Sequence, residues 1–385
     1  MTLQLPRPAP RRSAPSPLAT LPLLRRIDGL RTGYADELAL FRGVGGWTIV
    51  AGLALLYLAT PLVVDDFWLS VMNFTAIAGI AAIGLNLLTG FTGQVSLGHG
   101  FFLGLGAYTA GYLGGDLHLP VLVWLPAAGL VGALVGLLAG PFALRLRGLY
   151  LAIVTLGLVF VGEHLFLNLR QITGGPQGRV VPSPLIDGLN FADLHSSLGL
   201  PLSREQSFFL FVFPILALAA IAAKNIARSR PGRAFQAIRD REIAAAIIGV
   251  DRARYKVAAF VVSSFYAAAA GALYGSYLRH ITPGQFDLLS SIQFVAMIIV
   301  GGVGTVYGSI AGAFFVVLVP RVVEGLSPAI PFVSHSAGGS GVSVFVLNQL
   351  LFGVLIVLFL VFEPLGLAGI WARLRTYVRT WPFSY

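Results

Sequence analysis

Polar side chains crowd a glycine-rich stretch between two apolar runs, GLNLLTGFTGQVSLGHGFF at residues 84–102. Five of them could hydrogen-bond a small polar solute: Asn86, Thr89, Gln94, Ser96 and His99. Because an unpaired polar group is costly in hydrocarbon, these side chains must face protein or a water-filled cavity. A glycine-broken span with converging polar groups is typical of a solute path or gate. A polar turn between two spans is the alternative, and the pattern leaves both open.

A second stretch, RSRPGRAFQAIRDREIAAAIIGVDRARYK at residues 228–256, is rich in charge. Pro231 suits the first turn of a helix, and Gly249 suits the position just past a helix end. Between them, four apolar residues surround the charged run 239–242 at helical spacing: Phe235, Ile238, Ile243 and Ile247. The pattern predicts a short amphipathic helix against the inner membrane face. Such a helix either docks a soluble partner or anchors the loop to lipid headgroups.

Glu163 is an ionisable residue inside an apolar run, and His164 follows it. Ionisable groups within spans are candidates for contacting an ion or the amine of a solute. The position of Glu163 toward the outer end of its run equally allows the carboxylate to reach water. The chain has no cysteine, which excludes disulfides and thiolate metal sites. We expect no metal site and no catalytic residue.

Composition indicates the class of protein. The chain has 385 residues, of which 56% are hydrophobic and only 11% are charged, and its mean hydropathy is +0.83. Soluble proteins carry about a quarter charged residues, and apolar runs of roughly 20 residues indicate membrane spans. We therefore predict an all-α polytopic membrane protein of about ten transmembrane helices, some of them glycine-broken. The predicted spans are 47–64, 69–90, 99–115, 120–144, 149–168, 208–224, 257–278, 288–303, 308–324 and 343–363.

Basic residues between the spans predict the orientation. The net charge of +10 could suggest nucleic acid, but Lys and Arg between spans are typical of cytoplasmic loops. With the Arg- and Pro-rich segment 1–46 as a disordered cytoplasmic tail, the densest basic cluster, 225–256, is also cytoplasmic. Segment 371–385 is then a cytoplasmic C-terminal tail, and loop 169–207 is periplasmic. The permease domain is expected to cover residues 47–370.

Glycines spaced at four residues predict close helix contacts. Two triples stand out: Gly132, Gly136 and Gly140, and Gly304, Gly308 and Gly312. Small residues at this spacing line one helix face and let two backbones approach closely.

Both polar stretches resemble the branched-chain amino acid permease family of ABC importers, the LivH/LivM family. The first carries Leu-Asn-Leu at 85–87, Gly-Gln-Val-Ser-Leu-Gly-His at 93–99 and Gly-Ala-Tyr at 106–108. The second carries Gly-Arg-Ala at 232–234, Ala-Ile-Arg at 237–239 and Tyr-Lys at 255–256. Segments 173–178, 297–313 and 362–369 are similar to the LivM branch.

The resemblance implies that this chain is one half of the transmembrane dimer of an ATP-driven importer in a bacterial inner membrane. Its partners would be a LivH-like second permease subunit, two ABC ATPase subunits that carry ATP and Mg²⁺, and an external solute-binding protein. Segment 225–256 would be the loop that couples the permease to the ATPases. The coupling residues would be Gly232, Arg233, Ala234, Arg239, Glu242, Ala245 and Gly249.

In that case, the ATP that drives import must be bound by a separate subunit. Lys224 and Lys256 are the only lysines, and neither lies in the Gly-Lys-Ser/Thr pattern of a phosphate-binding loop. The expected solute is a branched-chain or other neutral amino acid, with urea, short amides and small aromatic acids as alternatives. A stand-alone secondary transporter or channel is a second alternative, but it would need more ionisable groups within its spans.

Overall fold

A computed structural model describes residues 43–145, 148–186, 189–191, 194, 201–326, 333–334 and 342–380. The chain divides into two compact units, residues 1–56 and 57–385. Within the first unit, residues 43–56 belong to a helix. The predicted tail 1–46 otherwise lies outside the described residues.

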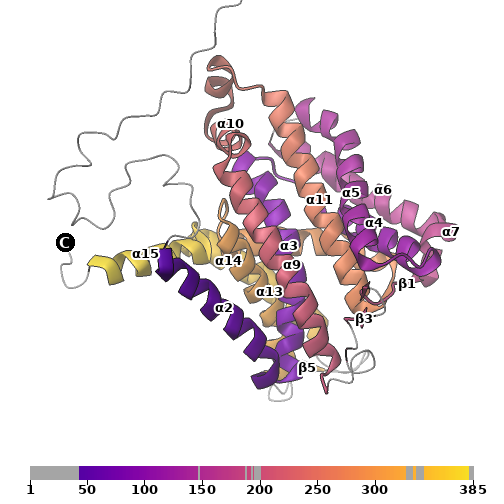
Figure 1. Cartoon of the computed structure of the whole chain (residues 1–385). Coiled ribbons are helices and arrows are strands. Elements are labelled where there is room, and N and C mark those ends of the chain that lie inside the picture. Colours follow the sequence, from indigo (N-terminus) through magenta and orange to yellow (C-terminus); the bar gives the residue numbers. More distant parts are fainter. Residues whose placement is uncertain are drawn as a thin grey trace, which may run out of the picture. The chain divides into compact units, whose positions relative to one another are not determined.

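Helices account for nearly all of the described chain (Figure 1). The α-helices are α2 (Gly43–Val63), α3 (Asp66–Thr92), α4 (His99–Ala110), α5 (Val121–Arg145), α6 (Leu149–Asn168), α7 (Arg170–Thr173), α9 (Arg204–Arg228), α10 (Arg230–Ile247), α11 (Arg252–Leu278), α12 (Leu288–Gly301), α13 (Val306–Leu326), α14 (Val344–Phe362) and α15 (Gly366–Thr380). A π-helix, η3 (Gly111–Asp116), and two 3-10 helices, η4 (Gly175–Gln177) and η5 (Pro283–Phe286), complete them. The strands are two residues each: β1 (Arg179–Val180), β2 (Leu185–Ile186), β3 (Leu189–Asn190), β4 (His280–Ile281), β5 (Val333–Ser334) and β6 (Val342–Ser343).

All ten predicted spans fall on helices, which confirms the all-α polytopic class. Among the described residues, six helices are long and apolar enough to cross a membrane alone, and a bent pair within 349–378 would make a seventh. Two shorter apolar helices, Ala51–Val63 and Val306–Val322, correspond to the predicted first and ninth spans. The predicted span 99–115 is α4 continued by the π-helix η3. Several of the ten segments are therefore short or broken.

Helix α11 occupies the centre of the bundle and packs against α3, α4 and α5. Its inner faces carry Ala, Ser and Gly, so neighbouring backbones come close to it. A Cβ atom at Gly132 would lie 2.6 Å from the Ser264 carbonyl oxygen, and one at Gly136 would lie 2.5 Å from the Ser264 hydroxyl. The first glycine triple is thus a packing face of α5, as predicted.

The second triple divides between two roles. Gly308 and Gly312 on α13 lie against the backbone of α12, where a Cβ at Gly312 would approach the Met297 carbonyl oxygen to 1.9 Å. Gly304 lies before α13, in the turn after α12, with φ 84°. A single helix face through all three glycines was therefore a wrong prediction, because the left-handed backbone at Gly304 interrupts the helix.

The helices have two distinct ends in the unit 57–385. At one end, α10 lies beyond α9 and α11, at the top of Figure 1. At the opposite end, the predicted loop 169–207 contributes β1, which pairs antiparallel with β4 after α11. The same end holds an ion-dipole cluster in which the Glu205 carboxylate accepts from the Tyr277 hydroxyl at 2.6 Å and from the Asn73 amide at 3.0 Å. α10 and the described residues of loop 169–207 thus lie at opposite ends; which end faces the cytoplasm stays a prediction.

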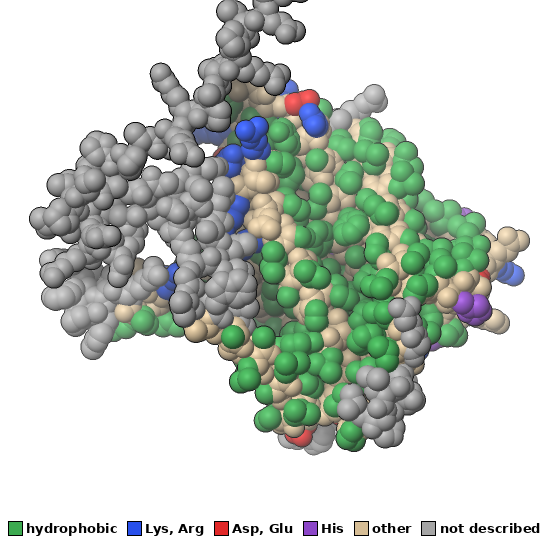
Figure 2. All heavy atoms as spheres, in the orientation of Figure 1, with side chains coloured by type: hydrophobic (Ala, Val, Ile, Leu, Met, Phe, Trp, Pro, Cys, Tyr) green, Lys and Arg blue, Asp and Glu red, His purple; other side chains and the backbone are tan. Residues whose placement is uncertain are grey.

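Hydrophobic side chains cover much of the face shown in Figure 2. On α5, Leu130, Leu134 and Leu138 are exposed one turn apart. Exposed apolar surface of this extent is typical of contact with lipid or with another membrane subunit. Toward the C-terminus, α15 is amphipathic and carries Arg373, whose guanidinium pairs with Glu363 at the end of α14.

Candidate functional site

The predicted coupling segment is helical but not one straight helix. Residues 230–240 and 242–247 of α10 are separated by Arg241, whose backbone is non-helical at φ −153° and ψ 93°. Phe235 and Ile238 before the kink are buried, at 2% and 3% exposed, whereas Ile243 and Ile247 after it are 67% and 81% exposed. The prediction of one amphipathic face through all four residues was therefore wrong. The kink turns the second apolar pair away from the protein.

The first segment is held against the end of α9. A Cβ atom at Gly232 would lie 2.3 Å from the Ile226 carbonyl oxygen, so no larger residue fits this corner. Ala234 beside it is buried, and the Arg233 guanidinium donates to the Arg228 carbonyl at 3.0 Å. The Gly-Arg-Ala motif thus forms a tight junction between α9 and α10.

Arg239 connects this segment to the glycine-rich stretch. Its guanidinium donates to the Gly90 carbonyl at 2.9 Å, near the C-terminal end of α3, where a cation also complements the helix dipole. Its aliphatic stem lies against Gly93, where a Cβ atom would be 3.3 Å from the Arg239 Cγ. Gly304 lies close to the same guanidinium. One side chain therefore touches the α3–α4 break and the α12–α13 turn together.

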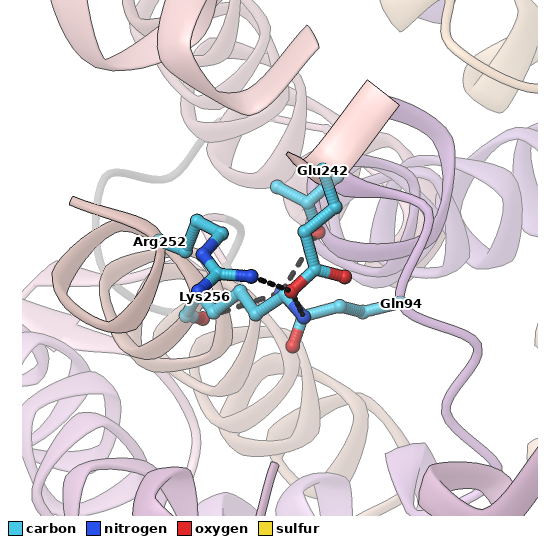
Figure 3. A network of polar contacts seen from close by, with 5 residues as sticks. Gln94, Glu242, Arg252 and Lys256 are labelled. Carbon is cyan, nitrogen blue, oxygen red and sulfur yellow. Dashed lines mark hydrogen bonds and ion pairs between the residues drawn. The ribbon is translucent and has the colours of Figure 1, made fainter. Parts of the chain in front are cut away.

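Glu242 holds the start of the second segment (Figure 3). Its carboxylate accepts from the Lys256 Nζ at 2.7 Å and lies 3.6 Å from the Arg252 guanidinium. Lys256 is only 8% exposed, and its backbone carbonyl accepts from the Gln94 amide at 3.3 Å. The network joins the kinked loop, α11 and the glycine-rich stretch.

The second segment ends as the sequence predicts. Gly249 adopts φ 89°, and the backbone N–H groups of Gly249 and Val250 donate back to Ala246 and Ala245. This is a helix stop that favours glycine. Ala245 is buried, while Ile248 is 75% exposed. The three exposed isoleucines, Ile243, Ile247 and Ile248, form what we call the isoleucine tip.

Asn86 is bound to the α12–α13 turn. Its amide oxygen accepts from the Gly304 N–H at 2.8 Å, and its amide nitrogen donates to the Thr305 carbonyl at 2.9 Å and the Ser309 hydroxyl at 2.7 Å. The side chain is 1% exposed. Asn86 therefore holds the turn that Arg239 also touches.

The other four predicted solute-path residues close the α3–α4 break. The Thr89 hydroxyl donates to the Gln94 carbonyl at 3.0 Å, and the Ser96 hydroxyl accepts from the Gly98 N–H at 3.3 Å. The His99 Nε2 lies 2.9 Å from the Ala81 carbonyl oxygen of α3. All five polar side chains thus have hydrogen-bond partners within this chain. Their role in a solute path stays a prediction, although the buried Gln94 amide oxygen has no partner among the described residues.

Glu163 lies half-buried on α6, beside Gly162, which packs against Phe101. The structure does not bring it to the residues above. Sequence reasoning missed the Glu205 cluster at the opposite end of the bundle, although Ser203 and Gln206 show the spacing of a helix capping box, which the structure contains.

These two stretches meet in space, at the Arg239–Gly90 and Gln94–Lys256 contacts. The family described as the permease component of branched-chain amino acid transport systems matches residues 67–360. This chain belongs to that family. The high-affinity branched-chain amino acid transport system permease protein LivM of Escherichia coli is 31% identical over 331 residues, covering 83% of this chain and 74% of the relative.

Other permeases are similar to this chain at lower identity. LivH of Salmonella typhimurium is 25% identical over 263 residues, 65% of this chain and 81% of the relative. A probable ABC transporter permease protein of Sinorhizobium fredii, y4mJ, is 28% identical over 320 residues, 80% of this chain and 87% of the relative. No solved structure gives a significant match. This chain is thus similar to permeases of both the LivM and the LivH type.

Proposed function

We propose that this permease is the transmembrane subunit of an ATP-driven importer for branched-chain or other neutral amino acids. The observation that carries the proposal is the link from the kinked α10 to both glycine breaks. Arg239 reaches Gly90 at the α3–α4 break and lies close to Gly304 in the α12–α13 turn, and Glu242 reaches Lys256 on α11. The relatives named for branched-chain amino acid transport support the solute class.

The mechanism follows from this link. The isoleucine tip is apolar and exposed, so it docks on a separate ATPase subunit. ATP and Mg²⁺ belong to that subunit, and this chain contributes no catalytic residue. Closure of the ATPases moves α10 as a short lever, and Arg239 passes the movement to α3 and to the α12–α13 turn. The permease then alternates between states open to opposite sides.

The assembly consists of this chain, a LivH-like second permease, two ATPases and a solute-binding protein at the end that carries β1 and β4. We place it in the bacterial inner membrane with α10 and both termini in the cytoplasm. The densest basic loop then lies inside.

Reconstituted uptake tests the solute. Proteoliposomes that contain this chain with its partner subunits should accumulate labelled leucine only when ATP is inside with the ATPases. Valine should compete, whereas urea and benzoate should not. Failure of every aliphatic amino acid to compete would contradict the solute class.

Coupling is tested separately with a matched pair of glycine variants. Gly249→Leu strains a left-handed turn beside the isoleucine tip, and Gly148→Leu strains a left-handed turn elsewhere; a Cβ at either position meets nothing within 4 Å. Gly249→Leu, like Glu242→Arg, should abolish co-purification of the ATPases while membrane insertion is unchanged. Gly148→Leu should keep the complex. Normal assembly of Gly249→Leu and Glu242→Arg would refute the docking role of α10.

A further inference from the structure

A cavity of about 190 Å³ lies among α3, α4, α11, η5, α12 and α13. Its wall is aromatic on one side, where Phe74, Tyr274 and Phe286 have ring centroids 6.3 Å apart in successive pairs. Ile77, Ala78, Leu103, Phe294, Met297 and Val317 line the rest, with three polar residues: Gln285, Ser290 and Gln293. No charged side chain is among these lining residues.

Polar groups with free hydrogen-bonding capacity line this otherwise apolar space. No described residue hydrogen-bonds the side chain of Gln293 or the hydroxyl of Tyr274. The Gln285 amide oxygen accepts from the Thr282 N–H at 3.3 Å, which leaves its amide nitrogen free to donate. All three side chains are partly exposed, so a ligand or water in the cavity can complete their hydrogen bonds. Convergent polar groups in an apolar cavity are the usual mark of a small-molecule site.

The cavity lies in the half of the bundle away from α10. Phe74 and Ala78 belong to the first half of α3, and Tyr274 to the last turns of α11. Behind the wall, the His99 ring packs on Phe294 at 5.2 Å. The motif residue His99 therefore supports the wall from behind. In the proposed orientation, this half is the one that a solute reaches first.

We propose that this cavity is a binding site for one neutral amino acid with an aliphatic side chain, within this single chain. The inference rests on the proposed function and adds where the solute is held. The aromatic and aliphatic wall receives the side chain, and Gln293, Gln285 and Tyr274 bind the polar head. The volume is below the roughly 300 Å³ of sites for drug-sized ligands, so the occupant is small. The wall offers no charged partner to the side chain of an acidic or basic amino acid, so burying that additional charge is costly and a neutral side chain is favoured.

Cysteine protection tests the site directly, because the chain has no native cysteine. Ser290→Cys places a thiol on the cavity wall, and Ser70→Cys is its matched control. Each native hydroxyl donates to the carbonyl three residues earlier, at 2.7 Å in both cases, and only Ser290 lines the cavity. A small water-soluble methanethiosulfonate is applied to the assembled complex without ATP, and its addition is followed by the intact mass of this chain.

Leucine at about ten times its dissociation constant should slow labelling of Ser290→Cys roughly tenfold, because the empty fraction falls as 1/(1 + [L]/Kd). Labelling of Ser70→Cys should not change, and glutamate should protect neither. Adding Gln293→Leu to Ser290→Cys should raise the half-protecting leucine concentration roughly tenfold, the effect of one lost hydrogen bond. Unchanged labelling of Ser290→Cys under leucine would overturn the site, as would equal protection of Ser70→Cys.

Uptake separates this inference from the proposed function. Ala78→Phe fills the cavity, and Ala222→Phe fills a separate apolar groove of about 290 Å³ beside α9. Ala78→Phe should lower leucine uptake more than roughly tenfold with the ATPases still bound, and Ala222→Phe should not. Normal uptake by Ala78→Phe would overturn the binding-site inference, and the proposed importer function would be unaffected. Protection of Ser290→Cys in a complex without ATP-driven uptake supports the site and overturns the importer.

Discussion

At the scale of single residues, the site depends on polar side chains that join segments far apart in the sequence. Asn86 binds the N–H of Gly304, 218 residues later, and Arg239 binds the carbonyl of Gly90. Each of these contacts completes a backbone group that a helix end or a turn leaves without a partner. Buried backbone groups need such partners, so the side chains are expected to be required for folding as well as for coupling.

Asn86→Leu should lower stability by about 1–3 kcal/mol, because it removes the acceptor of the Gly304 N–H and three hydrogen bonds made by a buried side chain. Asn168→Leu is the matched control, since Asn168 is exposed and, among the described residues, its amide hydrogen-bonds only His164 in the preceding turn of α6. Thermal unfolding of the detergent-solubilised chain measures both. Equal melting temperatures for the two variants would argue against the turn-holding role of Asn86.

Glu242 and Lys256 should be energetically coupled by about 1–2 kcal/mol in a double-mutant cycle of Glu242→Gln and Lys256→Met. The reason is that Lys256 is 8% exposed and loses a carboxylate partner 2.7 Å away. Lys256→Met in the Glu242→Gln background should therefore cost less than in the native chain. Additive losses would show that the ion pair contributes nothing to holding the kink.

At the scale of elements, helix contacts through small residues hold the bundle together. A Cβ atom at Gly106 of α4 would lie 1.8 Å from the Ala268 carbonyl oxygen of α11, and one at Gly271 would lie 1.9 Å from the Leu103 carbonyl oxygen. The two backbones are therefore in direct contact. Lipid offers no hydrophobic force between helices, so this close packing provides much of the association energy.

Gly106→Ala should destabilise the bundle by about 1–3 kcal/mol or prevent its folding, since one added methyl group forces α4 away from α11. Gly157→Ala on α6 is the control, because a Cβ there meets nothing within 4 Å. Yield of monodisperse protein and melting temperature report both effects. A native-like Gly106→Ala variant would mean that the α4–α11 contact is looser than described.

At the scale of the whole chain, function depends on which end of the unit 57–385 faces the cytoplasm. Ile247 on the isoleucine tip and Val180 on β1 are 81% and 68% exposed and belong to the two opposite ends. The basic loop 225–256 predicts that the isoleucine tip faces inward.

In intact cells, an impermeant thiol reagent should label Val180→Cys but not Ile247→Cys. Opening the inner membrane should make Ile247→Cys reactive. The native chain, which has no cysteine, gives the blank. Labelling of Ile247→Cys in intact cells would show that the isoleucine tip faces outward. That result would contradict both the predicted orientation and the ATPase contact.

The sequence by itself determined the membrane class, the ten helical segments and the family, through two stretches that resemble it. Hydrophobic runs and helix ends are local properties, so Pro231 and Gly249 could be recognised at the limits of α10 from their chemistry alone. Only the tertiary structure showed that Arg241 turns Ile243 and Ile247 away from Phe235 and Ile238. It also showed that Asn86 holds a distant turn and that Gln293 lines a cavity. The physical reason is that a side chain's partners depend on how the helices are arranged in space, and spacing along the chain does not encode which distant backbone group lies within hydrogen-bond reach.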